Sequence, residues 1–352
     1  MSTSINQMLA YALDVGASDL HLSVGSIPMV RIHGEMKKLQ LPILTIDTMT
    51  AIKDDILSAN QKELFNERLE IDFSTALEDK GRFRVNFFNQ INGMSAVFRA
   101  IPSEIKSCQE LGVPPIMNQL SLKEKGLVLL TGPTGSGKST TLAAMIDHIN
   151  ENRSKHIITI EDPVEYFHNS KNCMLNQREL GQSTHSFGNA IKSALREDPD
   201  VILVGEMRDL ETIQLALTAA ETGHLVLSTL HTSSAVKTID RIVDVFPAGQ
   251  KEHIRSMLSE SLLAVIAQKL LRNKNKDGRV PACEIMIANS AVRNLIREDK
   301  IYQIPSLIQG GSQEGMQTLD QDLQRLLHQG LIDRKEAAKV AEKPEVFEKG
   351  VF

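Results

Sequence analysis

The chain has 352 residues, which is enough for two domains that each bury a hydrophobic core. Hydrophobic residues make up 41% of it and charged residues 24%, a globular composition that argues against disorder, collagen and coiled-coil arrays. It contains 39 Lys and Arg against 44 Asp and Glu, with 11 Phe, 3 Tyr and no Trp. Because nucleic-acid binding needs positive charge and stacking aromatics, we expect no nucleic-acid partner.

Targeting and membrane signals are missing from the sequence as well. The N-terminus has no basic segment followed by an apolar one, and no run approaches the ~20 apolar residues that span a bilayer. Cys108, Cys173 and Cys283 lie far apart without a C-x-x-C pair, which argues against a zinc module and favours reduced thiols. We therefore expect a soluble intracellular protein without a transmembrane segment.

Residues 1–105 have the pattern of a small mixed α+β domain. Apolar residues at helical spacing, β-branched runs and turn signals predict helices at residues 4–15 and 45–57 and strands at 19–23 and 29–33. Residues 81–99 then alternate, which predicts a hairpin that turns near residue 92. One of its faces is apolar, with Phe83, Val85 and Phe87, and the opposite face is basic and half-exposed.

A second domain is predicted at residues 121–352, after a linker at 106–120 that is rich in Pro and Gly. From Gly126 short apolar runs alternate with helical segments, as in a parallel sheet buried on both faces. Strands are predicted at residues 127–131, 157–160, 201–204 and 225–229, and helices at 139–150, 187–196 and 210–222. The predicted fold class is α/β: an α+β domain, then a nucleotide-binding core with a predominantly helical C-terminal tail from residue 251.

Residues 132–139 match the phosphate-binding pattern G-x-x-x-x-G-K-[ST] and lie between an apolar strand and a helix, as that motif requires. Its glycines let backbone N–H groups surround a β-phosphate, and the helix N-terminus adds a favourable dipole. Lys138 supplies charge for the phosphates and Ser139 a hydroxyl for Mg²⁺, whereas a glycine-rich turn without nucleotide is the alternative. The predicted contacts of ATP and Mg²⁺ are Gly132, Pro133, Thr134, Gly135, Ser136, Gly137, Lys138, Ser139 and Thr140.

Acidic residues follow two of the apolar strands. Glu206 ends one strand, where a carboxylate can bind magnesium through water or polarise the attacking water, and the alternative is an acid paired with Arg208. Glu161 follows another strand and is a second magnesium candidate, although the Asp-Pro pair after it is an ordinary turn starter. We predict Glu206 as the hydrolytic carboxylate, with Glu161 as a further catalytic and metal-binding residue and Glu165 as a weaker candidate.

His224 and His231 flank the strand predicted at 225–229. Seven residues apart on an extended chain, they lie ~23 Å from each other and cannot ligate one metal ion from that strand. His231 is at the end that faces the phosphates, so it is a candidate for sensing the γ-phosphate, with a structural role as the alternative. For His224, at the other end, the local chemistry favours a structural role.

An arginine from a neighbouring subunit often neutralises transition-state charge in phosphoryl transfer, with a gain of about 10³–10⁵ in rate. Arg196, before the strand of Glu206, is one candidate. Arg82, Arg84 and Arg99 of the first domain are candidates as nucleotide contacts, and the alternative is that these strand arginines are simply solvated.

Residues 132–140, 160–165, 196–209 and 221–231 form four blocks with further similarity. They resemble the Walker A, aspartate box, Walker B and histidine box of the secretion-superfamily ATPases, specifically of the type IV pilus retraction ATPases (PilT-like), and the resemblance covers nearly the whole chain. Residues 291–298 (AVRNLIRE) resemble the block that retraction ATPases use for retraction. The chain also lacks the tetracysteine module typical of assembly and type II secretion ATPases.

The resemblance implies a hexameric Mg-ATPase that powers pilus retraction and twitching motility. A PAS-like first domain would pack against the RecA-like domain of the next subunit, with ATP between them, so Arg82, Arg84 and Arg99 become nucleotide or interface contacts. It also strengthens the cases for Glu161, Glu165, His224 and His231. The implied partners are the pilus platform protein and a second retraction ATPase, at the cytoplasmic face of the inner membrane.

Two positions depart from the family pattern. Val292 replaces Ile, a near-isosteric change, and Lys192 stands where many retraction ATPases have Arg, which weakens a finger role because Lys lacks the planar fork. Three alternatives remain open. They are a pilus-assembly or type II secretion ATPase, a nucleic-acid translocase on the same core, and a nucleotide-gated scaffold without turnover.

Overall fold

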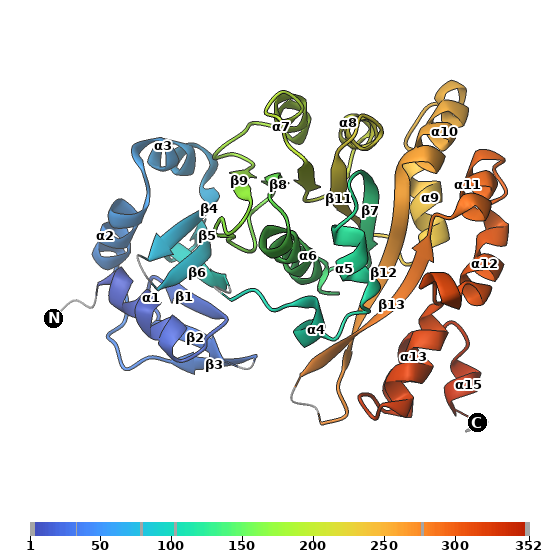
Figure 1. Cartoon of the computed structure of the whole chain (residues 1–352). Coiled ribbons are helices and arrows are strands. Elements are labelled where there is room, and N and C mark those ends of the chain that lie inside the picture. The colour runs from blue at the N-terminus through green and yellow to red at the C-terminus, as the bar shows by residue number, and fades with distance from the viewer. Residues whose placement is uncertain (1–3, 33, 78–79, 102–103, 276–277, 349–352) are drawn as a thin grey trace. The chain divides into compact units, whose positions relative to one another are not determined.

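The structure is a computed structural model that describes residues 4–32, 34–77, 80–101, 104–275 and 278–348. The chain folds into two compact units, Met1–Glu104 and Ile105–Phe352 (Figure 1). Each unit has its own sheet and its own hydrophobic core.

The first unit contains a six-stranded sheet with the order β3-β2-β1-β6-β5-β4, in which every neighbouring pair is antiparallel. Its strands are β1 (Asp19–Ser23), β2 (Met29–Ile32), β3 (Glu35–Lys38), β4 (Glu70–Leu77), β5 (Gly81–Gln90) and β6 (Gly93–Ile101). Its helices are α1 (Ile5–Asp14), α2 (Ile46–Ile56) and α3 (Ala59–Arg68). The two predicted helices and the hairpin are confirmed, and β3, α3 and β4 are additions. His33, the end of a predicted strand, lies outside the described residues.

Alternation along β5 builds the core of this unit. Phe83, Val85 and Phe87 are all 0% exposed, as the sequence predicts. The Phe87 ring lies edge-on to Phe98 of β6 at a centroid distance of 6.0 Å, and edge-on to Phe65 of α3 at 6.3 Å. Edge-to-face aromatic pairs of this kind add to the stability that burial alone provides.

The second unit contains a seven-stranded sheet with the order β13-β12-β7-β11-β10-β8-β9. All neighbours are parallel except β13, which pairs antiparallel with β12. Its first five strands are β7 (Gly126–Thr131), β8 (His156–Glu161), β9 (Met174–Glu179), β10 (Val201–Val204) and β11 (Leu225–Leu230). Every residue of β7, β10 and β11 is buried, which explains their continuous apolar runs.

Helices cover both faces of this sheet, because successive strand residues point to opposite sides and both sides are apolar. On one face pack α4 (Cys108–Leu111), α5 (Ile116–Ser121) and α6 (Lys138–Asn152). On the other pack α7 (Phe187–Ala194), α8 (Leu210–Glu221), α9 (Ala235–Asp244) and α10 (Lys251–Ser261). Residues 106–120, which the sequence assigns to a linker, include α4 and most of α5 and contribute to the core on the α6 side.

The tail from residue 251 contains more helix than strand, as predicted, but it also contains two strands that the sequence analysis did not predict. These are β12 (Leu262–Arg272) and β13 (Arg279–Ile287), which form a long hairpin that extends the sheet. Both strands are buried on both faces for most of their length, and a continuous apolar run does not distinguish a buried strand from a helix. Helices do follow the hairpin: α11 (Ser290–Arg297), α12 (Ile304–Gly310), α13 (Leu319–His328), α14 (Arg334–Val340) and α15 (Pro344–Glu348).

Helix α11 contains most of the 291–298 block, and the side chain of Arg293 connects this helix to the end of α10. The Arg293 guanidinium donates to the carbonyls of Ser259, Glu260 and Leu262 at 2.5, 2.6 and 2.7 Å. A fourth bond goes to the carbonyl of Ala288 at 2.8 Å. The last carbonyls of a helix carry partial negative charge, so this cation stabilises the C-terminus of α10 and holds α11 against it.

Candidate active site

The loop between β7 and α6 has the backbone that the phosphate-binding motif requires. Gly132, Gly135 and Gly137 have φ values of +140°, +78° and +86°, a region that side-chain-bearing residues rarely adopt. Gly137 is the N-cap of α6, which begins at Lys138. The loop therefore leads into a helix N-terminus, where backbone N–H groups and the helix dipole favour an anion.

The Lys138 ammonium lies inside this loop. The side chain is 8% exposed, and Nζ donates to the carbonyls of Gly132 at 2.8 Å and Pro133 at 3.1 Å. Burial lowers its pKa below the usual 10.5, while the charges of Glu206 and Glu165 act in the opposite direction. Ser136 Oγ is also buried, without a hydrogen-bond partner among the described residues. A buried cation and an unsatisfied hydroxyl in a glycine-rich loop at a helix N-terminus fit a phosphate ligand.

Glu206 lies just past the C-terminal end of β10 and contacts two side chains. Its Oε2 is 2.8 Å from Arg208 Nη2, and its Oε1 is 3.3 Å from His231 Nε2. Burial acts to raise the pKa of Glu206, but the hydrogen bonds and charges of Arg208 and His231 outweigh it, so the pKa is below 4.5. The structure thus brings Glu206 and His231 together, and it also contains the Arg208 pair that the sequence offered as the alternative.

Glu161 follows β8, the strand beside β10, and its carboxyl group is in a different state. Burial raises its pKa to about 7, against hydrogen bonds from Thr159 Oγ1 at 2.6 Å and Gln177 Nε2 at 3.3 Å. The nearby charge of Glu165, which is itself exposed, raises the pKa further. Two carboxyl groups at one sheet edge, one ionised and the other near half-protonated at neutral pH, are suited to different tasks.

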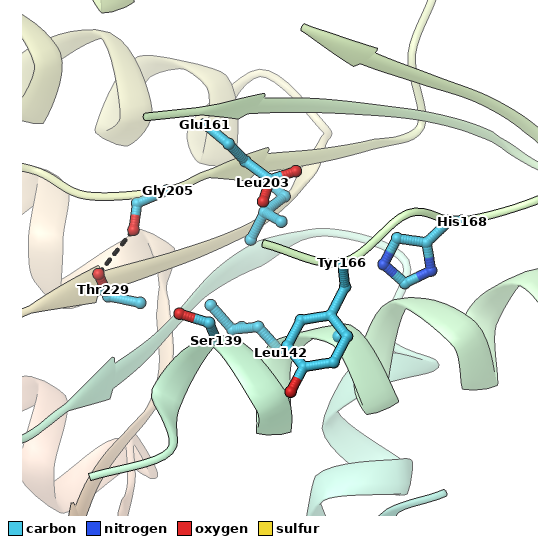
Figure 2. Close-up of a pocket in the computed structure, with 9 residues that line it drawn as sticks. Ser139, Leu142, Glu161, Tyr166, His168, Leu203, Gly205 and Thr229 are labelled. Atoms are coloured by element: carbon cyan, nitrogen blue, oxygen red, sulfur yellow. Dashed lines mark hydrogen bonds between the residues drawn. The ribbon is translucent and has the colours of Figure 1, made fainter. Parts of the chain in front are cut away.

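A small cavity of about 40 Å³ joins several of these groups (Figure 2). Figure 2 shows Ser139, from the first turn of α6, on one side of it, and Glu161 and Leu203 on the other. Tyr166 and His168 close it from the loop after β8, and Tyr166 Oη is 2.8 Å from Thr140 Oγ1. The predicted metal-binding residues Ser139 and Glu161 therefore line one cavity.

The donor set fits a nucleotide-bound Mg²⁺ better than a metal held by protein alone. Among the residues that the structure describes, no group of three or more His, Cys, Asp or Glu side chains is placed to hold a metal ion. Mg²⁺ commonly takes one or two protein oxygens and completes its shell with water and phosphate. Ser139 Oγ and a carboxylate from Glu161 or Glu206 are the oxygens that these residues offer.

Three other residues named from the sequence lie away from the phosphate loop. Arg196 is exposed and lies on the segment that enters the N-terminal end of β10, whereas Glu206 follows the C-terminal end. His224 Nδ1 is 2.9 Å from the carbonyl of Ala219 near the end of α8, a structural contact. Lys192 on α7 pairs with Glu211 on α8.

Arg82, Arg84 and Arg99 belong to the first unit. Arg84 and Arg99 are exposed and directly opposite each other on β5 and β6. Arg99 Nε is 2.9 Å from Oδ1 of Asp19, whose side chain is 7% exposed. Burial alone would raise the pKa of Asp19, but bonds from Ser18 and Arg99 lower it, so Arg99 has a structural partner. The roles of these arginines at a nucleotide stay predictions.

Four residues of the site were missed by the sequence analysis. Gln268 on β12 contacts the phosphate loop, and Thr229 on β11 donates to the carbonyl of Gly205 at 2.6 Å beside Glu206. Tyr166 and His168 of the cavity were missed as well. The sequence offers no local signal for Gln268, because its partner Ser136 is 132 residues away in the chain.

Known proteins are similar to this chain over nearly its whole length. The model of the Type II/IV secretion system protein family matches residues 1–339. The type IV pilus retraction ATPase PilT of Pseudomonas aeruginosa is 56% identical over 343 residues, 97% of this chain and 99% of that protein. A twitching motility protein of Neisseria gonorrhoeae is 58% identical over 318 residues, 90% and 85% of the two chains.

The fold is similar to that of a solved relative. The crystal structure of the pilus retraction motor PilT with bound ADP superposes with a TM-score of 0.93 at 47% identity, covering 99% of this chain and all of that one. Within the described residues, no helix has the length and apolar character needed to cross a membrane.

Proposed function

We propose a function on the premise that the chain belongs to the Type II/IV secretion system protein family and is an ATPase. The proposed function is a hexameric Mg-ATP-hydrolysing motor that powers type IV pilus retraction. One observation carries it: the loop with the buried Lys138 and the carboxylate of Glu206 follow the C-terminal ends of two parallel strands, β7 and β10, of one sheet, in a chain that is 56% identical to a retraction ATPase over 97% of its length. The phosphate loop and Glu206 support ATP hydrolysis, and the identity to a retraction ATPase supports pilus retraction as its use.

In this proposal the loop amides and Lys138 bind the phosphates of ATP. Ser139 and Glu161 would hold Mg²⁺, which would supply positive charge against the phosphates when bound. Glu206 orients and polarises the attacking water. Its lowered pKa keeps the carboxylate ionised at neutral pH but makes it a weak base, so positioning contributes more than full proton removal.

His231 contacts the same carboxylate and is the proposed reporter of the γ-phosphate. Arg208 competes for Glu206 in this structure, and we expect that pair to open when water and nucleotide are in place. Arginines of a neighbouring subunit complete the proposed site: Arg82, Arg84 and Arg99 from its PAS-like first unit, with Arg196 as a further candidate. This arrangement requires a ring in which each first unit packs on the RecA-like unit of the next chain.

The proposed partners follow from the family. They are the pilus platform protein, a second retraction ATPase and other copies of this chain, at the cytoplasmic face of the inner membrane. The 291–298 block on α11 would serve retraction, as in the retraction ATPases that it resembles.

The test is a count of surface pili on cells whose single copy carries Glu206→Gln. Abundant pili on cells that do not twitch are expected, because a motor that cannot hydrolyse ATP cannot disassemble fibres. Bald cells would contradict retraction and support an assembly motor. Glu151→Gln is the matched control, since Glu151 is also ion-paired, with Lys171, but lies at the end of α6 outside the four blocks, and its cells should twitch normally.

A further inference from the structure

Gln268 of β12 contacts the phosphate loop from within the protein core. Its side chain is 2% exposed, and Nε2 donates to the carbonyl of Ser136 at 2.7 Å. Its Oε1 accepts a bond from Thr141 Oγ1 at 2.9 Å. Ser136 belongs to the loop and Thr141 to the first turn of α6, so one amide joins the residues on either side of Lys138.

The backbone of β12 also approaches the loop closely. A Cβ added at Gly132 would lie 2.2 Å from the carbonyl oxygen of Gln268, and one added at Gly137 would lie 2.9 Å from Gln268 Nε2. Neither distance is possible for real atoms without movement. At Gly132 the obstacle is the backbone of β12, so this contact itself excludes a side chain. At Gly137 the obstacle is the end of the Gln268 side chain, and the positive φ angle is the stronger reason for glycine.

These contacts have an energetic consequence for the loop. A buried amide that loses its partners retains an unfavourable desolvation cost, so Gln268 stabilises the loop conformation that satisfies it. When the Ser136 carbonyl is held by Nε2, the plane of its peptide group is fixed. The next N–H, that of Gly137, belongs to this same peptide group and is fixed with it. A loop held in this way does not need to be ordered at the moment of binding.

We propose that Gln268 is a positioning residue for nucleotide binding, which acts by holding the phosphate loop through Ser136 and Thr141. The inference rests on the proposed ATP-hydrolysing function and extends it to a strand outside the recognised motifs. It assigns no chemical step to Gln268. Its effect should appear in affinity more than in turnover, because the loop contacts the phosphates both before and during reaction.

The test measures ADP binding and steady-state ATP hydrolysis by the purified full chain. Gln268→Met keeps the approximate volume and removes both hydrogen bonds, so we expect the Kd for ADP and the KM for ATP to rise about ten-fold. The kcat should stay within about two-fold of wild type, as for a loss of uniform binding. Ser261→Ala is the matched control, because Ser261 is 3% exposed and bonds to the carbonyl of Met257, outside the loop.

If Gln268→Met does not fold, two variants of Thr141 test the same proposal. Thr141→Val removes one of the two bonds and should raise the Kd for ADP about three-fold, whereas Thr141→Ser, which retains a hydroxyl, should bind like wild type. An unchanged Kd in Thr141→Val, or an equal rise in Ser261→Ala and Gln268→Met, would overturn the proposal. ADP binding is independent of the direction of pilus movement, so a failure of the retraction proposal would leave this result intact.

Discussion

The two sheets of the molecule use their strands in different ways. Strand β5 of the first unit buries one face, with Phe83 at 0% exposure, and leaves Arg84 exposed on the other. Strands β7, β10 and β11 of the second unit are buried on both faces, so their functional groups follow the strand ends. A half-buried antiparallel sheet can present a binding face, whereas a fully covered parallel sheet concentrates its chemistry at one edge.

The largest expected effect is at that edge. Glu206→Gln should lower the rate of ATP hydrolysis about 10³-fold, because the amide cannot polarise water as a carboxylate does. Measurement of phosphate release at saturating ATP checks this. Hydrolysis at the wild-type rate would remove Glu206 from the mechanism. It would also contradict the view that the second sheet concentrates its chemistry at the ends of its strands.

Phe83→Ala should be the most damaging change in the interior of the first sheet. The ring is fully buried, and the lost burial plus the cavity should reduce the free energy of unfolding by about 3–4 kcal/mol. Urea unfolding followed by circular dichroism measures it. A loss below about 1 kcal/mol would mean that this core repacks easily.

On the exposed face of the same sheet, Arg99→Ala and Arg84→Ala should separate stability from function. Arg99→Ala leaves the buried Asp19 carboxylate with Ser18 and the more distant Arg31, at 3.7 Å, and should cost about 1–2 kcal/mol. Arg84→Ala should change stability by less than about 0.5 kcal/mol, since the side chain is exposed. A drop in ATP turnover for Arg84→Ala, without a change in unfolding, would place this face at a neighbour's nucleotide.

We also expect a pH dependence of stability in the absence of nucleotide and Mg²⁺. Burial raises the pKa of Glu161 from 4.5 to about 7, so the folded protein binds this proton more tightly than the unfolded chain does. Its contribution to stability is therefore present below pH 4.5 and is lost as the pH rises through about 7. Glu161→Gln should flatten the decline in urea midpoint between pH 5 and 8.

Glu206→Gln is the contrasting variant for that measurement. The pKa of Glu206 is lowered, so its contribution is present above pH 4.5 and is lost below it. The variant should therefore leave the slope between pH 5 and 8 as it is in wild type. An equal change of slope in both variants would contradict the opposite pKa shifts of Glu161 and Glu206.

The sequence predicts the parts of the molecule whose signals are local. The phosphate loop and the continuous apolar strands are encoded in single segments, and Glu206 is recognised by its position after one of them. Strand β12 was missed because a buried strand and a buried helix share the same apolar run. Gln268 was missed because its role depends on a contact between distant segments, which tertiary packing alone creates.

The attachment of α11 through Arg293 has a consequence for reagents made from its sequence. A free peptide copied from residues 291–298 would display both of its arginines, but in the protein the guanidinium of Arg293 is occupied by four carbonyl groups. Val292 and Ile296 are buried as well, which leaves Ala291, Asn294, Arg297 and Glu298 on the surface. Antibodies or competitor peptides should therefore be designed on a folded helical scaffold that presents this second set alone.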